Sequence, residues 1–157
     1  MDFTKTENMN IEEVREYCLT LPYVTEDEFC PEVITFRIEG KWFLMMWLEA
    51  PEPRVAVKCD PVLAIELRER YHGVEPAYHM NKKMWNDLYL ERDLDEEEIR
   101  KWIRHSYEEV AKKLPKMVQT RTLSTTLDSF IQNLLKSLLA RQVTGLSSML
   151  YLSQSIY

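Results

Sequence analysis

The segment from Tyr78 to Asn86 contains two adjacent lysines, one histidine and two large aromatic residues, and it contains no acid. Lysine side chains can neutralise phosphates, and an asparagine amide can hydrogen-bond the edge of a base or a backbone oxygen. Aromatic rings can stack on bases, which is worth about 1–3 kcal/mol per base at single-stranded sites. The segment is therefore a candidate nucleic-acid contact, and its candidate residues are Tyr78, His79, Asn81, Lys82, Lys83 and Trp85.

A structural explanation of the same segment is also open. In a β-hairpin, Tyr78 and Trp85 would face the core, Asn81 would adopt a turn conformation, and the two lysines would only be solvated. A second basic pair, Arg37 and Lys41, flanks another turn signal. Both connections are candidates for phosphate contacts, and residue types alone do not decide between the two explanations.

The charge of the chain limits how nucleic acid could be bound. Its 157 residues include 20 basic and 26 acidic side chains, so the formal net charge is -6 and the isoelectric point is near 5.2. Sequence-independent binding needs a basic face, because neutralised phosphates release condensed counterions. We therefore expect any contact with DNA to be weak and local rather than spread over the whole surface.

Most catalytic and metal-binding signatures are absent from the sequence. Its three glycines cannot form a dinucleotide fingerprint or a phosphate-binding loop. The three histidines and three cysteines do not fall at metal-ligand spacings. Cys59 stands between a predicted strand and a predicted helix, where a helix N-terminus can lower a thiol pKa, but a buried structural thiol is the simpler interpretation. We expect no catalytic residue, no metal and no cofactor.

Cysteine usage and hydropathy indicate the compartment. Three widely spaced cysteines argue against a disulfide framework and favour the reduced cytoplasm. The longest apolar run, Trp42–Leu48, has seven residues, whereas a membrane-spanning helix needs about 20. The N-terminal residues are acidic and lack the apolar stretch of a signal peptide. We expect a cytoplasmic protein without a membrane partner.

Apolar periodicity predicts helices and strands between residues 9 and 116. Asn10 and Glu13 form a capping-box pattern that begins the first helix, and Pro22 ends it. The predicted elements, in order, are helix 10–21, strands 33–38, 41–48 and 54–58, helix 60–72, strands 74–80 and 84–90, and a helix that begins at residue 93 or 95 and ends before Pro115. This α-β(3)-α-β(2)-α order indicates an α+β two-layer sandwich with an antiparallel sheet.

Residues 117–157 differ in composition from the preceding residues. They contain one acid and three basic residues, whereas residues 1–116 contain 25 acids and 17 basic residues. A helix is predicted at about 121–141, because apolar residues recur there at steps of three and four: Leu123, Leu127, Phe130, Ile131, Leu134, Leu138 and Leu139. This stripe could pack on the domain, pair with a second copy or stay frayed, and the tail could also have no selected structure.

Four blocks of the sequence resemble the MmcQ/YjbR family: Asn10–Leu19 (NIEEVREYCL), Val57–Pro61 (VKCDP), Gly73–Lys83 (GVEPAYHMNKK, followed by Trp85) and His105–Tyr107 (HSY). The resemblance covers residues 9–116, so residues 1–8 form an N-terminal extension and residues 117–157 an atypical tail. It implies the secretion-chaperone-like α-β(3)-α-β(2)-α fold. It also implies DNA binding by a double-wing arrangement, in which the wings would be the hairpins around Lys82–Lys83 and Arg37–Lys41.

Two functions remain open at this point. The first is a small non-enzymatic DNA-binding module, in which Lys82, Lys83 and Arg37 bind phosphates at the hairpin tips. The alternative is a protein-interaction or self-associating module, which would use the apolar strand Trp42–Leu48 and the apolar stripe of the tail to bind a protein partner or form a homodimer. Charge reversal of the two lysines and the size of the chain in solution distinguish them.

Overall fold

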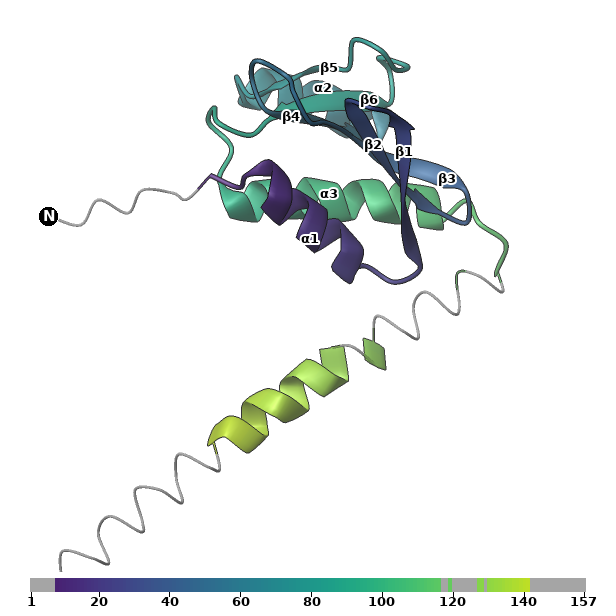
Figure 1. Ribbon diagram of the computed structural model, residues 1–157, viewed down its shortest axis with the longest axis vertical. Coiled ribbons are helices and arrows are strands. Elements are labelled where there is room, and N and C mark those ends of the chain that lie inside the picture. Colours follow the sequence, from purple (N-terminus) through teal and green to yellow (C-terminus); the bar gives the residue numbers. More distant parts are fainter. Residues whose placement is uncertain (1–7, 117–118, 120–126, 129, 142–157) are drawn as a thin grey trace, which may run out of the picture. The chain divides into compact units, whose positions relative to one another are not determined.

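The computed structural model describes residues 8–116, 119, 127–128 and 130–141. The chain divides into two units, residues 1–119 and 120–157. The helices of the first unit are α1 (Ile11–Thr20), α2 (Pro61–Arg70) and α3 (Glu96–Ala111). Its strands are β1 (Val24–Cys30), β2 (Val33–Ile38), β3 (Lys41–Trp47), β4 (Arg54–Lys58), β5 (Val74–Pro76) and β6 (Trp85–Tyr89) (Figure 1).

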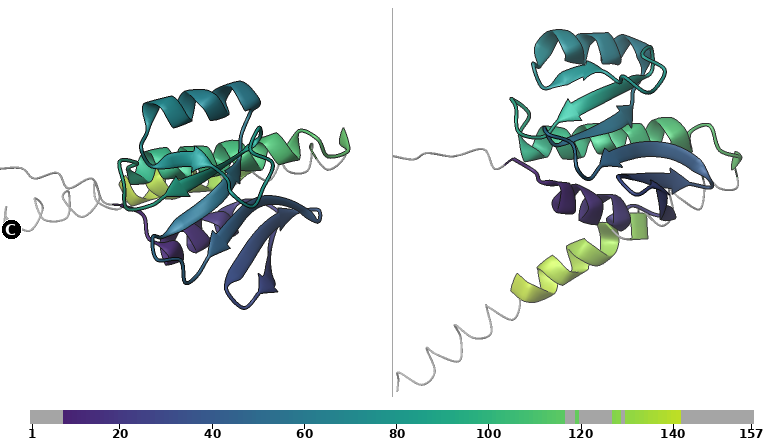
Figure 2. Two further views of the ribbon diagram at one scale, coloured as in Figure 1. Left: turned by 90° about the horizontal axis from the view of Figure 1, so that it is seen from above. Right: turned by 45° about the horizontal axis from the view of Figure 1, so that its top comes forward.

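The six strands form one sheet in the order β1-β2-β3-β4-β6-β5. Each neighbouring pair is antiparallel. Helices α1 and α3 lie against one face of the sheet, and α2 packs near β5 at one edge (Figure 1, Figure 2). The predicted α+β class with an antiparallel sheet is therefore confirmed.

Strand β1 was not predicted. Four strands precede α2 in the structure, whereas the sequence predicted three. It lies at the edge of the sheet, pairs only with β2, and is mostly exposed. Its centre carries three consecutive acids, Glu26, Asp27 and Glu28. An exposed edge strand has no fully buried face that would impose alternation of apolar residues, and its charges discourage pairing with other chains.

Local capping signals position the helices as predicted. The side-chain Oδ1 of Asn10 accepts a hydrogen bond from the backbone N–H of Glu13 at 3.0 Å, and the carboxylate of Glu13 accepts one from the backbone N–H of Asn10 at 2.8 Å. Val14 and Cys18 turn toward the core. Asp60 caps α2 with its carboxylate.

The main core lies between the sheet and helices α1 and α3. It includes Phe36, Leu44, Met46, Val55, Val57 and Leu88 from the strands, with Val14, Cys18, Ile99, Ile103 and Val110 from the helices. A smaller cluster on the other face contains Val33, Met45, Ala56, Ala77 and Trp85, against which Trp42, Trp47, Met80 and Met84 pack. Residues 43–46 of β3 are all buried. The apolar strand predicted at 42–48 therefore corresponds to β3, which is one of the interior strands of the sheet rather than an open surface, although Leu48 lies beyond it and is exposed.

The strand predicted at residues 74–80 ends at Pro76. After it, the backbone N–H of Ala77 donates to the carbonyl of Trp85 at 3.0 Å, and the N–H of Met84 donates to the carbonyl of Asn81 at 3.0 Å. These bonds form a turn-rich connection, residues 77–84, between β5 and β6. The candidate residues at 78–83 therefore lie in a loop rather than on a strand.

Residues 130–141 of the second unit are helical. Their large apolar side chains, together with that of Leu127, are exposed: Phe130, Ile131, Leu134, Leu135, Leu138 and Leu139. Residues 121–126 and 129 of the predicted helix, Leu123 included, and residues 1–7 lie outside the described residues. Among the helices that the structure describes, none is long and apolar enough to cross a bilayer.

Candidate nucleic-acid interface

The two predicted basic connections lie at the same end of the sheet. Ile38 pairs with Lys41 across the β2–β3 turn, and Lys58 at the end of β4 pairs with Trp85 at the start of β6. Because β3 and β4 are antiparallel, the start of β3 lies beside the end of β4. The β2–β3 turn, the end of β4 and the part of the 77–84 connection next to Trp85 therefore follow one another across this end, whereas the ring of His79 lies 6.1 Å from that of Trp47, at the opposite end of β3. We call the end of the sheet at the β2–β3 turn the basic end, and its cations are Arg37, Lys41, Lys58, Lys82, Lys83 and Lys113.

A pocket of about 400 Å³ opens at the basic end. The β2–β3 hairpin and the end of β4 form one side, and the C-terminal end of α3 forms the other. Four of the lining side chains are cationic, one is aromatic, and none is a carboxylate: Arg37, Gly40, Lys41, Trp42, Lys58, Val110 and Lys113. Like charges repel, so this arrangement indicates a surface that is suited to an anion.

Lys58 is a partly buried cation of this pocket. Burial lowers the pKa of its ammonium group, and the like charges of Lys113 and Lys41 lower it further, whereas Glu109 opposes them. The backbone N–H of Lys58 donates to the hydroxyl of Ser106 at 2.7 Å. Because Ser106 is buried in α3, this bond fixes the end of β4 against the helix.

Two acids near the pocket reduce its positive charge. The Oδ2 atom of Asp27 lies 3.2 Å from the Nε atom of Arg37, whose guanidinium also lies over the ring of Trp42 at 5.4 Å. Glu109 forms an ion pair with Lys112 at 2.5 Å and lies 4.0 Å from the ring of His105. Arg37 is thus partly neutralised and oriented by β1, while Lys41, Lys58 and Lys113 carry most of the charge.

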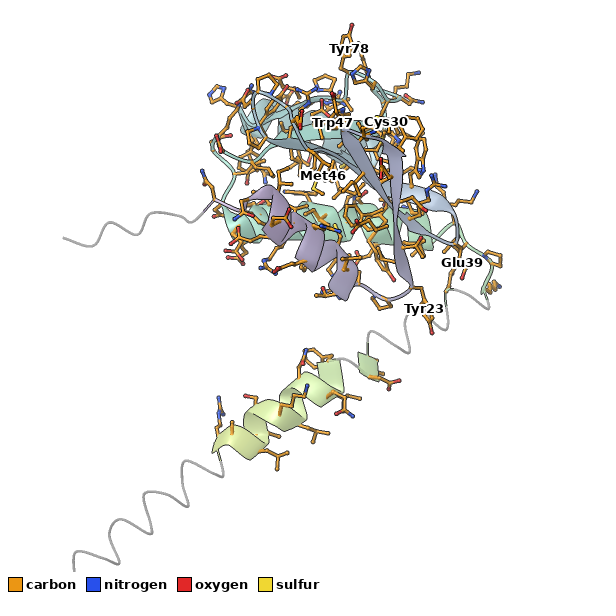
Figure 3. All side chains as sticks on the ribbon, viewed as in Figure 1. Tyr23, Cys30, Glu39, Met46, Trp47 and Tyr78 are labelled. Atoms are coloured by element: carbon orange, nitrogen blue, oxygen red, sulfur yellow. The ribbon has the colours of Figure 1, made fainter. Side chains whose placement is uncertain are left out.

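In the 77–84 connection, the structure exposes the predicted polar residues. Tyr78 is 74% exposed and points away from the ribbon (Figure 3). The Nζ atom of Lys82 lies 5.7 Å from the centre of the Tyr78 ring, and His79 and Lys83 are also exposed. Asn81 has the turn role of the structural explanation, because its Oδ1 accepts from the N–H of Lys83 at 3.0 Å.

Trp85 does not fit its predicted role as a stacking residue. Its side chain is only 6% exposed and belongs to the smaller core cluster. It begins β6, where alternation turns it inward beneath the 77–84 connection. A base could reach this ring only if the cluster opened, so Trp85 is a core residue, as the structural explanation of the segment proposed.

Arg68 is a residue that the sequence analysis missed. From α2, its Nε donates to the side-chain oxygen of Asn86 at 2.7 Å, and its Nη2 donates to the carbonyls of Lys82 and, at 3.3 Å, Trp85. Burial lowers its pKa. These bonds anchor the base of the lysine-bearing connection, although Arg68 and Lys82 are far apart in sequence and no local motif links them.

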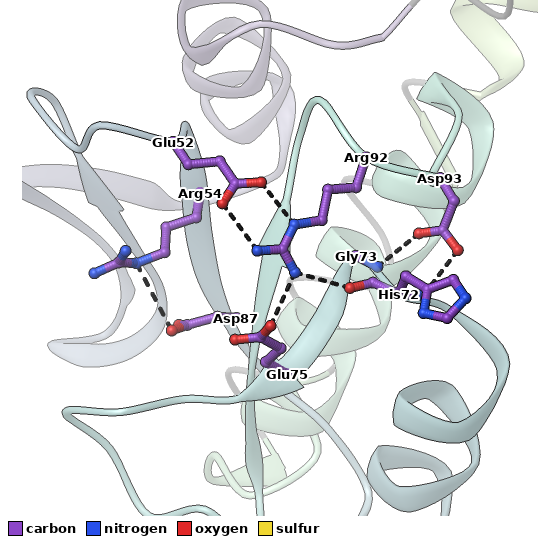
Figure 4. Close-up of polar contacts among 8 residues, drawn as sticks. All are labelled: Glu52, Arg54, His72, Gly73, Glu75, Asp87, Arg92 and Asp93. Carbon is purple, nitrogen blue, oxygen red and sulfur yellow. Dashed lines mark hydrogen bonds and ion pairs between the residues drawn. The ribbon is translucent and has the colours of Figure 1, made fainter.

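A second polar cluster stands away from the basic end (Figure 4). Arg92 donates twice to Glu52, at 2.6 and 2.8 Å, and once to Glu75 at 2.9 Å. Asp93 accepts from the backbone N–H groups of His72, at 2.8 Å, and Gly73, at 2.6 Å. These bonds tie together the loops before β4, before β5 and after β6, so their role is structural.

Asp87 is the buried carboxylate of this region. It is 3% exposed, and its Oδ2 lies 3.7 Å from the Nε of Arg54. Burial raises its pKa to about 6, although Arg54 and the backbone N–H of Tyr78 oppose the shift. Among the described residues, its Oδ1 has no hydrogen-bond partner.

The thiols and carboxylates give no indication of a catalytic or metal centre. Burial raises the pKa of Cys59 to about 12, with Asp60 as the next cause, so this thiol stays protonated at neutral pH. Cys18 is also buried, and burial raises its pKa. In the described ranges, no group of three or more His, Cys, Asp or Glu side chains is placed to hold a metal ion.

Comparison with known sequences finds related proteins in bacteria. The model of the YjbR family matches residues 19–109. YbdF of Escherichia coli O157:H7 is 32% identical over 114 residues, which cover 70% of this chain and 91% of that protein. YjbR of Escherichia coli K12 is 30% identical over 108 residues, which cover 68% of this chain and 92% of that protein.

Solved structures agree with the fold described above. A crystal structure of a Deinococcus radiodurans protein with a DUF419 domain has a TM-score of 0.68 and 26% identity, and the match covers 73% of this chain and 88% of that one. A crystal structure from Pseudomonas syringae has a TM-score of 0.56 and 26% identity, over 64% of this chain and 97% of that one.

Proposed function

The chain belongs to the YjbR family, and we propose that its folded domain binds nucleic acid weakly and locally through the basic end of the sheet. The observation that carries this proposal is the position of the two basic connections. Arg37 and Lys41 stand at one of them, Lys82 and Lys83 at the other, and Lys58 comes from the strand end between them. These cations are far apart in sequence, and their position at the same end of the sheet supports the proposal.

The chemistry of the contact follows from these side chains. The exposed lysines would neutralise phosphates, and the exposed ring of Tyr78 would stack on an unpaired base beside them. The rest of the domain is acidic, so the number of phosphates bound should be small. We expect a dissociation constant of about 10⁻⁴–10⁻⁶ M at physiological salt, the range of sequence-independent binding.

A titration with a labelled oligonucleotide at several salt concentrations tests this proposal. Each phosphate contact contributes about 0.7 to the slope of log K against log salt for a single strand. Reversing both charges in Lys82→Glu/Lys83→Glu should therefore lower the slope by about 1.4 and weaken binding. The matched control is Lys101→Glu/Arg104→Glu, which reverses two charges on the exposed side of α3.

The two variants decide the outcome together. If the control weakens binding as much as the Lys82/Lys83 variant does, the effect comes from net charge and the basic end has no special role. If neither variant changes affinity or slope, the proposal is wrong. Circular dichroism of each variant verifies that the fold is retained.

Self-association through the tail is a second candidate, and the apolar stripe of residues 130–141 favours it. A helix with such a stripe gains free energy when the stripe is buried against another apolar surface. Light scattering of the full chain and of a version that ends at Lys116 tests this candidate. Self-association predicts a concentration-dependent mass for the full chain alone, and identical monomers would exclude it.

A further inference from the structure

The pocket at the basic end has the size of a small-molecule site and a lining that is mainly cationic. Its volume of about 400 Å³ falls within the range of about 300–1,000 Å³ that is usual for ligand pockets. Trp42 and Val110 supply apolar surface, and Arg37, Lys41, Lys58 and Lys113 supply charge. We propose that this pocket binds a phosphomonoester, with its phosphate among the lysines and its organic group against Trp42.

The charge balance of the pocket favours a dianion. Four cations line it, and two nearby acids are already engaged, Asp27 with Arg37 and Glu109 with Lys112, so Glu39 of the β2–β3 turn is the exposed acid that remains beside them. Burial, and then the like charges of Lys113 and Lys41, lower the pKa of Lys58, and an anion among the three lysines relieves the repulsion between them. A terminal phosphate carries about -1.5 to -2 at pH 7, whereas a phosphodiester carries a single charge.

The shape of the pocket also favours an end group. Val110, at the end of α3, and Lys113, which follows it, close one side of the pocket. A nucleic-acid chain that continued in both directions could not leave on that side, whereas a terminal phosphate does not need to. On the other side, Gly40 adopts a φ of +75°, and no atom lies within 4 Å of the position that a Cβ would take there. The turn is therefore open toward solvent, and a ligand can enter over Gly40.

Two sources of such a phosphate are chemically equivalent at the pocket: a free phosphorylated metabolite and the 5′ end of a nucleic-acid strand. The polymer form rests on the proposed function, because the rest of the strand would then run toward Lys82 and Lys83. The free form does not require the lysine pair. The two can therefore be separated by experiment.

The test is a titration of the ¹⁵N-labelled full chain, followed by amide chemical shifts. The probes are inorganic phosphate, adenosine 5′-monophosphate and, as the uncharged control, adenosine. We expect saturable shifts at Gly40, Lys41, Lys58 and Lys113 with the first two probes and none with adenosine. Lys113→Gln should weaken binding about tenfold or more, the usual effect of losing one charge-assisted hydrogen bond.

Lys113 is an exposed residue that follows α3, so its replacement should leave the fold intact, and Lys101→Gln serves as the matched control. Non-saturating shifts, or equal losses in both variants, would overturn the proposal. A pair of oligonucleotides with and without a 5′ phosphate identifies the source. Tighter binding of the phosphorylated one, lost in Lys113→Gln, supports the strand end.

The remaining combinations separate the two proposals. If adenosine 5′-monophosphate binds at these amides while neither oligonucleotide binds, the pocket proposal holds for a free ligand and the proposed nucleic-acid function fails. If both oligonucleotides bind equally through Lys82 and Lys83, and phosphate causes no saturable shift at the pocket, the nucleic-acid function holds and the pocket proposal fails.

Discussion

Replacing Asp87 by asparagine should stabilise the domain at neutral pH and have little effect in acid. Asp87 is 3% exposed, and burial raises its pKa from the ordinary 3.8 to about 6. The folded state therefore holds this proton more tightly than the unfolded state does. Protonated Asp87 therefore contributes to the unfolding free energy of the domain. This contribution is fully present below about pH 4 and is lost as the pH rises through about 6.

The size of the effect follows from the shift. About two pKa units, at about 1.36 kcal/mol each, correspond to about 3 kcal/mol at pH 7 as an upper value. The variant Asp87→Asn resembles the protonated carboxyl in size and charge, so it should be more stable than the natural chain by up to this amount at pH 7. Arg54 loses its carboxylate but keeps the rings of Trp47 and Tyr89, at 5.1 and 5.9 Å.

Urea denaturation followed by tryptophan fluorescence at pH 4 and pH 7 measures the effect. The relevant quantity is the difference in unfolding free energy between variant and natural chain at each pH, because other groups also titrate. Glu66→Gln, which removes one exposed carboxylate from α2, is the matched control and should show no such change. If the Asp87→Asn difference is the same at both pH values, Asp87 does not titrate in this window and the reasoning is refuted.

Four substitutions test the basic end and the loops around the sheet. Tyr78→Ala should weaken single-stranded oligonucleotide binding by about 1–3 kcal/mol in fluorescence anisotropy, and unchanged affinity would contradict a stacking role. Arg68→Gln removes the bonds that anchor residues 82–86 and should lower the unfolding free energy by about 1.5–3 kcal/mol in urea; no loss would contradict its role as an anchor. Gly73→Ala would place a Cβ 2.9 Å from Oδ1 of Asp93 and should cost about 1–3 kcal/mol in thermal denaturation. Gly40→Ala has open space around it and should cost only about 1 kcal/mol, from its positive φ; a smaller loss at Gly73 than at Gly40 would contradict the steric argument.

The elements that could be predicted are those whose signals are local. The capping box of Asn10 and Glu13 defines α1 within four residues, and both of its hydrogen bonds form. Strand β1 lacks such a signal, because an exposed edge strand has no core face that selects for apolar residues. The strand predicted after Gly73 is too long, because the alternation of apolar residues does not reveal that pairing ends at Pro76.

The residues of the candidate site also differ in how far the sequence predicts them. Tyr78 and Lys82 are exposed, as a contact residue must be. Trp85 is also aromatic, like Tyr78, but it is buried. Residue type alone does not distinguish the two, because their exposure depends on where β6 begins. Lys58 and Lys113 are 55 positions apart, and the packing of α3 on β4 is what brings them to one pocket.

The distribution of charge along α3 would allow an acidic domain to bind the proposed phosphate. The helix begins with Glu96, Glu97 and Glu98 and is followed by Lys112 and Lys113, so acids complement its N-terminus and cations its C-terminus. Its 16 residues span about 24 Å at 1.5 Å per residue. The Debye length is about 8 Å at physiological salt and about 30 Å at 0.01 M. At physiological salt a phosphate at the basic end is therefore screened from these acids, whereas in dilute buffer it experiences their repulsion. Affinity for an oligonucleotide should consequently rise less steeply below about 0.02 M salt than the phosphate contacts alone would produce, because the acids far from the contact then act against it.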